Sequence, residues 1–198
     1  MIQDGLFDRL FPRAIRGLSA MHWTPVEVAL RAAKLLVTKP GTRVLDVGAG
    51  AGKFCLVGAM STFGEYFGVE RRADLVHSAQ SIALALGVKN VTFCHGLFGA
   101  LNPENYDAFY FFNPFEETKL SLHAGVDWSR LAGREHFDLE VQKAQQFLRG
   151  ARPGTRVVTY NGMGGSLPWT YDLVHREDLD CPLELWVKDS QGRRYQPG

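Results

Sequence analysis

The segment Asp46–Gly52 has residue types and a spacing that suit the binding of a ligand. It reads Asp-Val-Gly-Ala-Gly-Ala-Gly, so a carboxylate is followed by three glycines at alternate positions. Glycine lets a ligand approach the main chain closely because it has no Cβ atom. An apolar run, Arg43–Val47, leads into the segment and a helical pattern follows it. Because the free N–H groups at a helix start attract a carboxylate or phosphate, the sequence predicts a ligand-binding turn here.

A second carboxylate, Glu70, ends the next apolar run, 24 positions after Asp46. A carboxylate at that place can accept hydrogen bonds from both hydroxyls of a ribose. A nicotinamide dinucleotide fingerprint, G-x-G-x-x-G, would need its third glycine at position 53, where this chain has Lys. The spacing therefore disfavours an NAD(P)-dependent oxidoreductase, which stays open as an alternative. Two plainer interpretations also stay open: Glu70 as a solvated strand-end charge, and Asp46 as a helix cap.

The pattern D-x-G-x-G-x-G after a Val-Leu strand resembles the first motif of class I (Rossmann-like) S-adenosylmethionine-dependent methyltransferases. The stretch Ala151–Val158 also resembles the segment before a later strand of that family, and the resemblance covers about residues 24–160. It implies S-adenosyl-L-methionine as cofactor and S-adenosyl-L-homocysteine as product. The cofactor-binding residues that it implies are Asp46, Gly48, Ala49, Gly50, Gly52, Glu70, Arg71, Gly96, Leu97 and Asn113.

The family often has Gly-Asp after its third strand, where the Asp meets the adenine amino group. This chain has Gly96-Leu97 instead. We therefore expect main-chain groups at these two residues to hold the adenine, with apolar packing from Phe98.

The run Phe112-Asn113-Pro114-Phe115 resembles the (D/N)-P-P-(Y/F) motif of methyltransferases that act on planar nitrogens, although one Pro is missing. The resemblance implies that Asn113 and Phe115 are the catalytic residues. Asn113 would accept a hydrogen bond from the substrate N–H, and the ring of Phe115 would stack on the acceptor. Methyl transfer depends mainly on positioning, which such residues can provide. The simpler interpretation is that Asn-Pro turns the chain and that Phe115 lies in the core.

These motifs predict a methyltransferase whose acceptor is a nitrogen of a small molecule or a protein side chain. A module that binds the cofactor without turnover is a further alternative. The identity of the acceptor and the oligomeric state are left open by the sequence.

The residues above must be positioned by strands that alternate with helices, which is typical of parallel βαβ units. We therefore predict a doubly wound, mostly parallel seven-stranded α/β sheet with helices on both faces and an antiparallel edge strand. Strands are expected at Arg43–Val47, Tyr66–Glu70, Val91–His95, Ala108–Phe112, Arg156–Tyr160 and Leu183–Val187, the last antiparallel and near an edge. Helices are expected over residues 24–37, 53–62 and 73–86, and around the apolar positions of Phe137–Leu148.

Three segments are expected: a helical or lid segment over residues 1–23, a methyltransferase domain over 24–190 and a loose tail over 191–198. Pro12 argues against a continuous helix in the first segment. Thr24 is placed to cap the helix that follows. The polar stretch Glu116–Arg134 is expected to be irregular.

The composition sets limits on partners and location. Lys and Arg number 22 against 21 for Asp and Glu, so no strong basic surface is expected and a nucleic acid partner is not favoured. No run approaches the length of a membrane span, and the first ten residues lack the apolar core of a secretion signal. Three widely spaced cysteines fit a reducing compartment. We expect a cytoplasmic protein that binds no metal, because no two His residues have ligand spacing.

Overall fold

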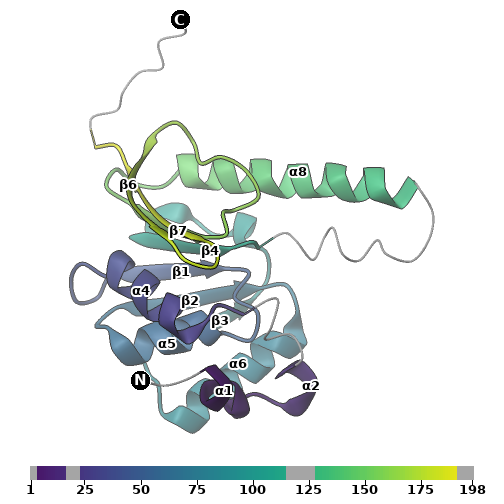
Figure 1. Cartoon of the computed structure of the whole chain (residues 1–198), viewed down its shortest axis with the longest axis vertical. Coiled ribbons are helices and arrows are strands. Elements are labelled where there is room, and N and C mark those ends of the chain that lie inside the picture. Colours follow the sequence, from purple (N-terminus) through teal and green to yellow (C-terminus); the bar gives the residue numbers. More distant parts are fainter. Residues whose placement is uncertain (1–3, 17–22, 115–127, 191–198) are drawn as a thin grey trace, which may run out of the picture.

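The protein is described by a computed structural model that covers residues 4–16, 23–114 and 128–190. Within these residues, seven strands form one sheet in the order β3-β2-β1-β4-β5-β7-β6 (Figure 1). The strands are β1 (Arg43–Val47), β2 (Glu65–Glu70), β3 (Val91–His95), β4 (Ala108–Phe112), β5 (Arg156–Tyr160), β6 (Tyr171–Asp178) and β7 (Pro182–Lys188). The predicted α/β sheet is confirmed.

The first five strands run parallel, whereas β7 is antiparallel to β5 and β6 is antiparallel to β7. The chain order reverses between β1 and β4, which are neighbours in the sheet. In open α/β sheets, ligands bind at such a reversal, outside the carboxyl ends of the strands. The fold thus brings the ends of β1, β2 and β4 to the place where a ligand site is expected.

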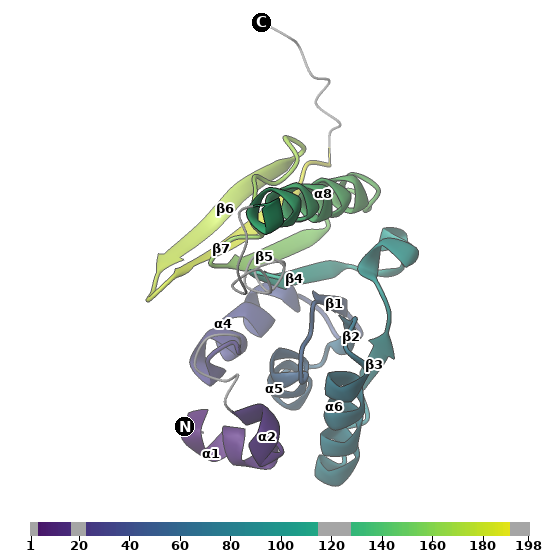
Figure 2. The ribbon, with the colours of Figure 1, turned by 90° about the vertical axis from the view of Figure 1, so that its right-hand side faces the viewer.

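Helices cover both faces of the sheet, as Figure 2 shows. The helices α4 (Val26–Leu36), α5 (Lys53–Ser61) and α6 (Ala73–Leu86) lie on one face, and α8 (Trp128–Arg149) lies on the other. Side chains alternate along each strand, so Val44 packs under α4 and α5, whereas Leu45 packs toward α8. Two apolar cores result, one on each face of the sheet.

Short helical turns join these elements. On the α8 face, η2 (Phe98–Ala100) and η3 (Pro103–Asn105) connect β3 to β4. The N-terminal segment forms α1 (Asp4–Phe7), η1 (Asp8–Leu10) and α2 (Arg13–Arg16), which lie beside α5 and α6 in both views. The segment is interrupted at Phe11-Pro12, as the proline predicts.

The structure corrects one expectation about secondary structure and adds a strand whose position was not predicted. Helix α8 begins at Trp128, so the second part of the stretch Glu116–Arg134 is helical rather than irregular; residues 115–127 lie outside the described part. The edge strand β6 was not located from the sequence, because most of its side chains on both sides are exposed and give no apolar alternation. The division of the chain at residues 23 and 190 stays a prediction.

The start of α4 also differs from the prediction. Thr24 does not cap the helix: its hydroxyl is hydrogen-bonded to the Tyr110 hydroxyl, 2.9 Å away. The first free amide of the helix, at Val26, instead donates to Oδ1 of Asp4 at 2.9 Å. A side chain from the N-terminal segment therefore satisfies the helix start.

Candidate functional site

Glu70 joins three segments at the carboxyl edge of the sheet. Its Oε2 atom accepts a hydrogen bond from the amide of Gly50 and its Oε1 atom accepts one from the amide of Arg72, both at 2.9 Å. Its main-chain oxygen accepts a bond from the amide of Gly96, also at 2.9 Å. The side chain is only 8% exposed. Each carboxylate oxygen can accept more than one hydrogen bond, so this fixed carboxylate keeps capacity for a ligand hydroxyl.

The glycine turn is held against the end of β2. The amides of Gly48 and Ala49 both donate to the Val69 oxygen at 3.0 Å. Gly52 has φ +85°, and a Cβ atom there would lie 2.5 Å from the Phe93 ring, so packing requires glycine at this position. Gly50 has φ +54°, but a Cβ atom there would meet nothing within 4 Å. The turn therefore has open space beside the residue that is bonded to Glu70.

Asp46 lies on the inner side of the turn. It is 4% exposed, and its Oδ2 atom accepts a hydrogen bond from the Cys55 thiol at 3.5 Å. Burial raises the pKa of the Asp46 carboxyl to about 7; the bond from Cys55 opposes this shift and the charge of Glu70 adds to it. The same burial raises the pKa of the Cys55 thiol well above its ordinary value. The Asp46 side chain is thus bonded to the first turn of α5, the helix that follows the glycine turn.

The end of β4 reaches the glycine turn from the neighbouring strand. A Cβ atom on Gly48 would lie 3.3 Å from Cβ of Pro114, so the two segments are in close contact. Asn113 has φ +42°, a left-handed conformation that Asn adopts more readily than most residues, and its amide donates to the Gly162 oxygen at 3.3 Å. The structure therefore brings Asn113 and the glycine turn to the same edge. Phe115, the other predicted catalytic residue, lies outside the described residues.

The end of β3 completes this edge. Nε2 of His95 is 3.0 Å from the main-chain oxygen of Arg71, which ties the ends of β2 and β3 together. Leu97 is 62% exposed, so its side chain is available to a ligand. Phe98 was expected to pack on adenine, and that expectation is wrong. Its ring is buried on the α8 face, 5.7 Å from the ring of Phe147, because η2 turns it into that core.

Two residues at this edge were missed by the sequence analysis. Asn161 follows β5 with φ +57°, one strand away from Asn113, and its amide donates to the Pro182 oxygen. Lys53 begins α5 with a side chain only 4% exposed, bonded to Asp4 and Asp8. No local pattern predicts this contact, because it joins residues more than 40 positions apart. The Asn-Gly pair at Asn161 was the one available signal for a left-handed turn.

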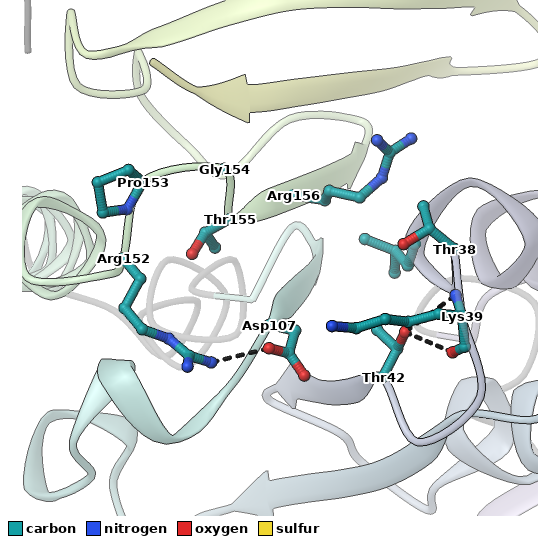
Figure 3. Close-up of a pocket in the computed structure, with 10 residues that line it drawn as sticks. Thr38, Lys39, Thr42, Asp107, Arg152, Pro153, Gly154, Thr155 and Arg156 are labelled. Atoms are coloured by element: carbon teal, nitrogen blue, oxygen red, sulfur yellow. Dashed lines mark hydrogen bonds and ion pairs between the residues drawn. The ribbon is translucent and has the colours of Figure 1, made fainter. Parts of the chain in front are cut away.

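A separate cavity of about 280 Å³ lies at the opposite edge, where the strands begin (Figure 3). Its lining includes Thr42 before β1, Asp107 before β4 and Arg152–Thr155 before β5. Asp107 forms an ion pair with Arg152 at 2.8 Å and accepts a bond from the amide of Arg43 at 2.9 Å. These polar groups bind one another, and none of the predicted site residues lines the cavity.

The described residues contain no group of three His, Cys, Asp or Glu side chains placed to hold a metal ion. No helix in this part of the chain is long and apolar enough to cross a membrane.

Several solved structures with similar folds are described as methyltransferases. An RNA methyltransferase from Salinibacter ruber, in complex with S-adenosyl-L-homocysteine, superposes with a TM-score of 0.64 at 19% identity over 85% of this chain and 95% of that chain. TrmN from Thermus thermophilus gives 0.63 at 20% identity over 92% of this chain but only 53% of its own. A SAM-dependent methyltransferase from Aquifex aeolicus gives 0.57 at 14% identity over 94% and 98%. At these identities the likeness shows a shared fold.

A comparison of the sequence with protein-family models assigns the chain to a family, which the shared fold alone does not do. The family model described as a methyltransferase domain matches residues 38–158, which run from before β1 into β5 and include the glycine turn, Glu70 and Asn113. The chain therefore belongs to the methyltransferase domain family and is a methyltransferase. No curated protein sequence matches it.

Proposed function

We propose that this protein transfers a methyl group from S-adenosyl-L-methionine to a nitrogen atom of its acceptor. The observation that carries the proposal is the junction at Glu70, where the carboxylate is fixed by the amide of Gly50 beside open space on the glycine turn. The Salinibacter protein, solved in complex with S-adenosyl-L-homocysteine, and the Aquifex SAM-dependent methyltransferase share the fold that forms this edge.

The residues of the edge have separate roles in this proposal. The Glu70 carboxylate binds the ribose hydroxyls, since each of its oxygens has already been oriented by a main-chain amide. The first amides of α5, which have no acceptor within the helix, bind the carboxylate of the amino-acid end. Gly96 and Leu97 hold the adenine. The Asp46 carboxyl, which accepts a hydrogen bond from the Cys55 thiol of α5, binds the amino-acid end beside the glycine turn.

The cofactor supplies an electrophilic methyl group on a sulfonium, so the protein's task is to position the acceptor. In the transfer, a C–N bond forms as the C–S bond breaks, the electron pair of that bond stays on sulfur, and the acceptor nitrogen loses a proton to solvent or a nearby base. Asn113, at the end of β4, orients the acceptor by accepting a hydrogen bond from its N–H group. Phe115 remains the proposed stacking partner.

The chemical class of the acceptor has to be tested with several kinds of molecule. The near-equal numbers of basic and acidic residues favour a small molecule or protein side chain over nucleic acid. The Salinibacter protein, however, is an RNA methyltransferase of similar fold, so RNA belongs in the panel of acceptors.

The test has two steps. Thermal shift and calorimetry compare S-adenosyl-L-methionine, S-adenosyl-L-homocysteine, NAD and NADP; the proposal expects the first two alone to bind and to raise the melting temperature. Transfer of a labelled methyl group is then measured to amine, peptide, RNA and catechol acceptors. Transfer to a nitrogen supports the proposal, and transfer to oxygen alone, or binding of NAD alone, contradicts it.

Asn161→Ala provides a matched control for Asn113→Ala. Both residues have a left-handed backbone conformation and follow neighbouring parallel strands. Both variants therefore introduce similar backbone strain. Asn113→Ala is expected to lower the rate constant for transfer at saturating cofactor much more than Asn161→Ala does, because only Asn113 is proposed to bind the acceptor. Equal loss in both variants contradicts the role of Asn113.

A further inference from the structure

Lys53 occupies an unusual place for a lysine. It is the first residue of α5, directly after Gly52 of the glycine turn, and its side chain is only 4% exposed. A positive charge in the first turn of a helix is unfavourable, because the helix dipole is positive at that end. A buried ammonium is unfavourable as well unless it is paired. A lysine at this position therefore requires compensation from elsewhere in the chain.

The compensation comes from the N-terminal segment. Nζ of Lys53 lies 2.6 Å from Oδ1 of Asp4 and 2.7 Å from Oδ1 of Asp8, so two carboxylates surround one ammonium. The Trp23 ring lies beside the same ammonium, with its centroid 5.8 Å away. Removing one partner of a buried ion pair is strongly destabilising, since it leaves the other charge uncompensated. The cluster therefore fixes the N-terminal segment to the residue that follows the glycine turn.

Other contacts hold the same segment in the same place. Oδ1 of Asp4 also accepts the bond from Val26, so one carboxylate oxygen connects the starts of α4 and α5. Phe7 and Phe11 are buried, and the Phe11 ring lies 4.4 Å from the Trp23 ring. The segment thus packs on the two helix starts that lie at the carboxyl edge of the sheet.

We infer that Lys53 is a positioning residue for cofactor binding, which couples the docking of residues 4–11 to the conformation of the glycine turn. The inference rests on the proposed cofactor site. When the segment is docked, the Lys53 charge is engaged by Asp4 and Asp8, and the start of α5 is held where the turn requires it. When the segment is released, an unpaired ammonium remains beside the turn. A ligand that binds the ordered turn must then favour docking, and docking must favour the ligand by the same factor.

Calorimetry and hydrogen exchange with S-adenosyl-L-homocysteine test this coupling on the full chain. In the unaltered protein, the ligand is expected to slow amide exchange in residues 4–11. Lys53→Met is expected to speed that exchange and to weaken binding by about 5- to 150-fold, the usual range of coupling between sites. Lys53→Arg, which keeps the charge, restores at least part of both. Lys34→Met, at an exposed lysine on α4, is the matched control and changes neither.

A second variant guards against a folding defect at the buried position. Asp4→Asn combined with Asp8→Asn removes the two charges from the segment and leaves Lys53 in place, and the same loss of affinity is expected. Faster exchange in residues 4–11 with unchanged affinity in either variant overturns the inference, as does ligand binding that leaves exchange of that segment unaltered. Failure of the unaltered protein to bind the ligand at all contradicts the cofactor site itself, and is thereby distinguished from failure of the coupling alone.

Discussion

The two edges of the parallel sheet use polar residues in opposite ways. At the amino edge, polar side chains satisfy one another or the strand starts, as Asp107 does with Arg152 and with the amide of Arg43. At the carboxyl edge, Glu70 binds two main-chain amides, and Gly50 beside it faces open space. The first arrangement links the starts of neighbouring strands. The second fixes a carboxylate that can still bind a ligand. Both edges carry polar groups, and they differ in what those groups are bonded to.

The largest effect is expected from glycine positions at the carboxyl edge. Gly52→Ala combines a left-handed backbone with a Cβ atom 2.5 Å from the Phe93 ring, so we expect a loss of about 2–5 kcal/mol in the free energy of unfolding. Gly50→Ala has the left-handed backbone without the clash and should lose only about 1–2 kcal/mol. Urea unfolding of both variants checks the difference. Equal losses in the two variants would show that the close contact with the Phe93 ring is not the reason why residue 52 is a glycine.

A pH-dependent effect is expected at Asp46. Its pKa is about 7 in the folded protein and 3.8 in the unfolded chain, so the unfolded state ionises first as pH rises, and this residue destabilises the fold progressively between about pH 4 and pH 7. Asp46→Asn removes this term. Its stability relative to the unaltered protein should therefore rise by about 1–3 kcal/mol from pH 4.5 to pH 7, the part of the full shift that falls within this pH range. Unfolding measured at both pH values checks this, and a difference independent of pH would contradict the buried neutral carboxyl.

A smaller effect is expected at the amino edge. Asp107→Ala removes one partly exposed ion pair and one acceptor for a main-chain amide, which should cost about 1–2 kcal/mol of stability. Asp107→Asn keeps an acceptor for the Arg43 amide and should lose less. Neither variant should change the dissociation constant of S-adenosyl-L-homocysteine, measured by calorimetry. A weakened dissociation constant would mean that the two edges are not separate in function.

The parts that could be predicted from the sequence are those with local signals. The apolar runs and the 3.6-residue period predicted the parallel strands and α4–α6, and the glycine spacing predicted the turn after β1. The hydrogen bond between Gly50 and Glu70 was not predicted. Strand β6 gave no such signal, because an edge strand exposed on both sides has no apolar alternation. Lys53 was noted only as a departure from a dinucleotide fingerprint. Its ion pairs with Asp4 and Asp8 depend on tertiary packing, which no local period records. Phe98 was assigned to the wrong neighbour for the same reason.

The central claim, that Glu70 at the carboxyl edge binds the cofactor, is tested most directly by comparing two glutamates of the same strand. Glu70 ends β2, whereas Glu65 begins it and is exposed. Calorimetry with S-adenosyl-L-homocysteine is expected to show about 10- to 150-fold weaker binding for Glu70→Ala, since hydrogen bonds to a charged group contribute about 1.5–3 kcal/mol, and unchanged binding for Glu65→Ala. Unfolding of both variants without ligand separates loss of binding from loss of the fold. Equal affinity for the two variants, with both folded, would contradict the claim.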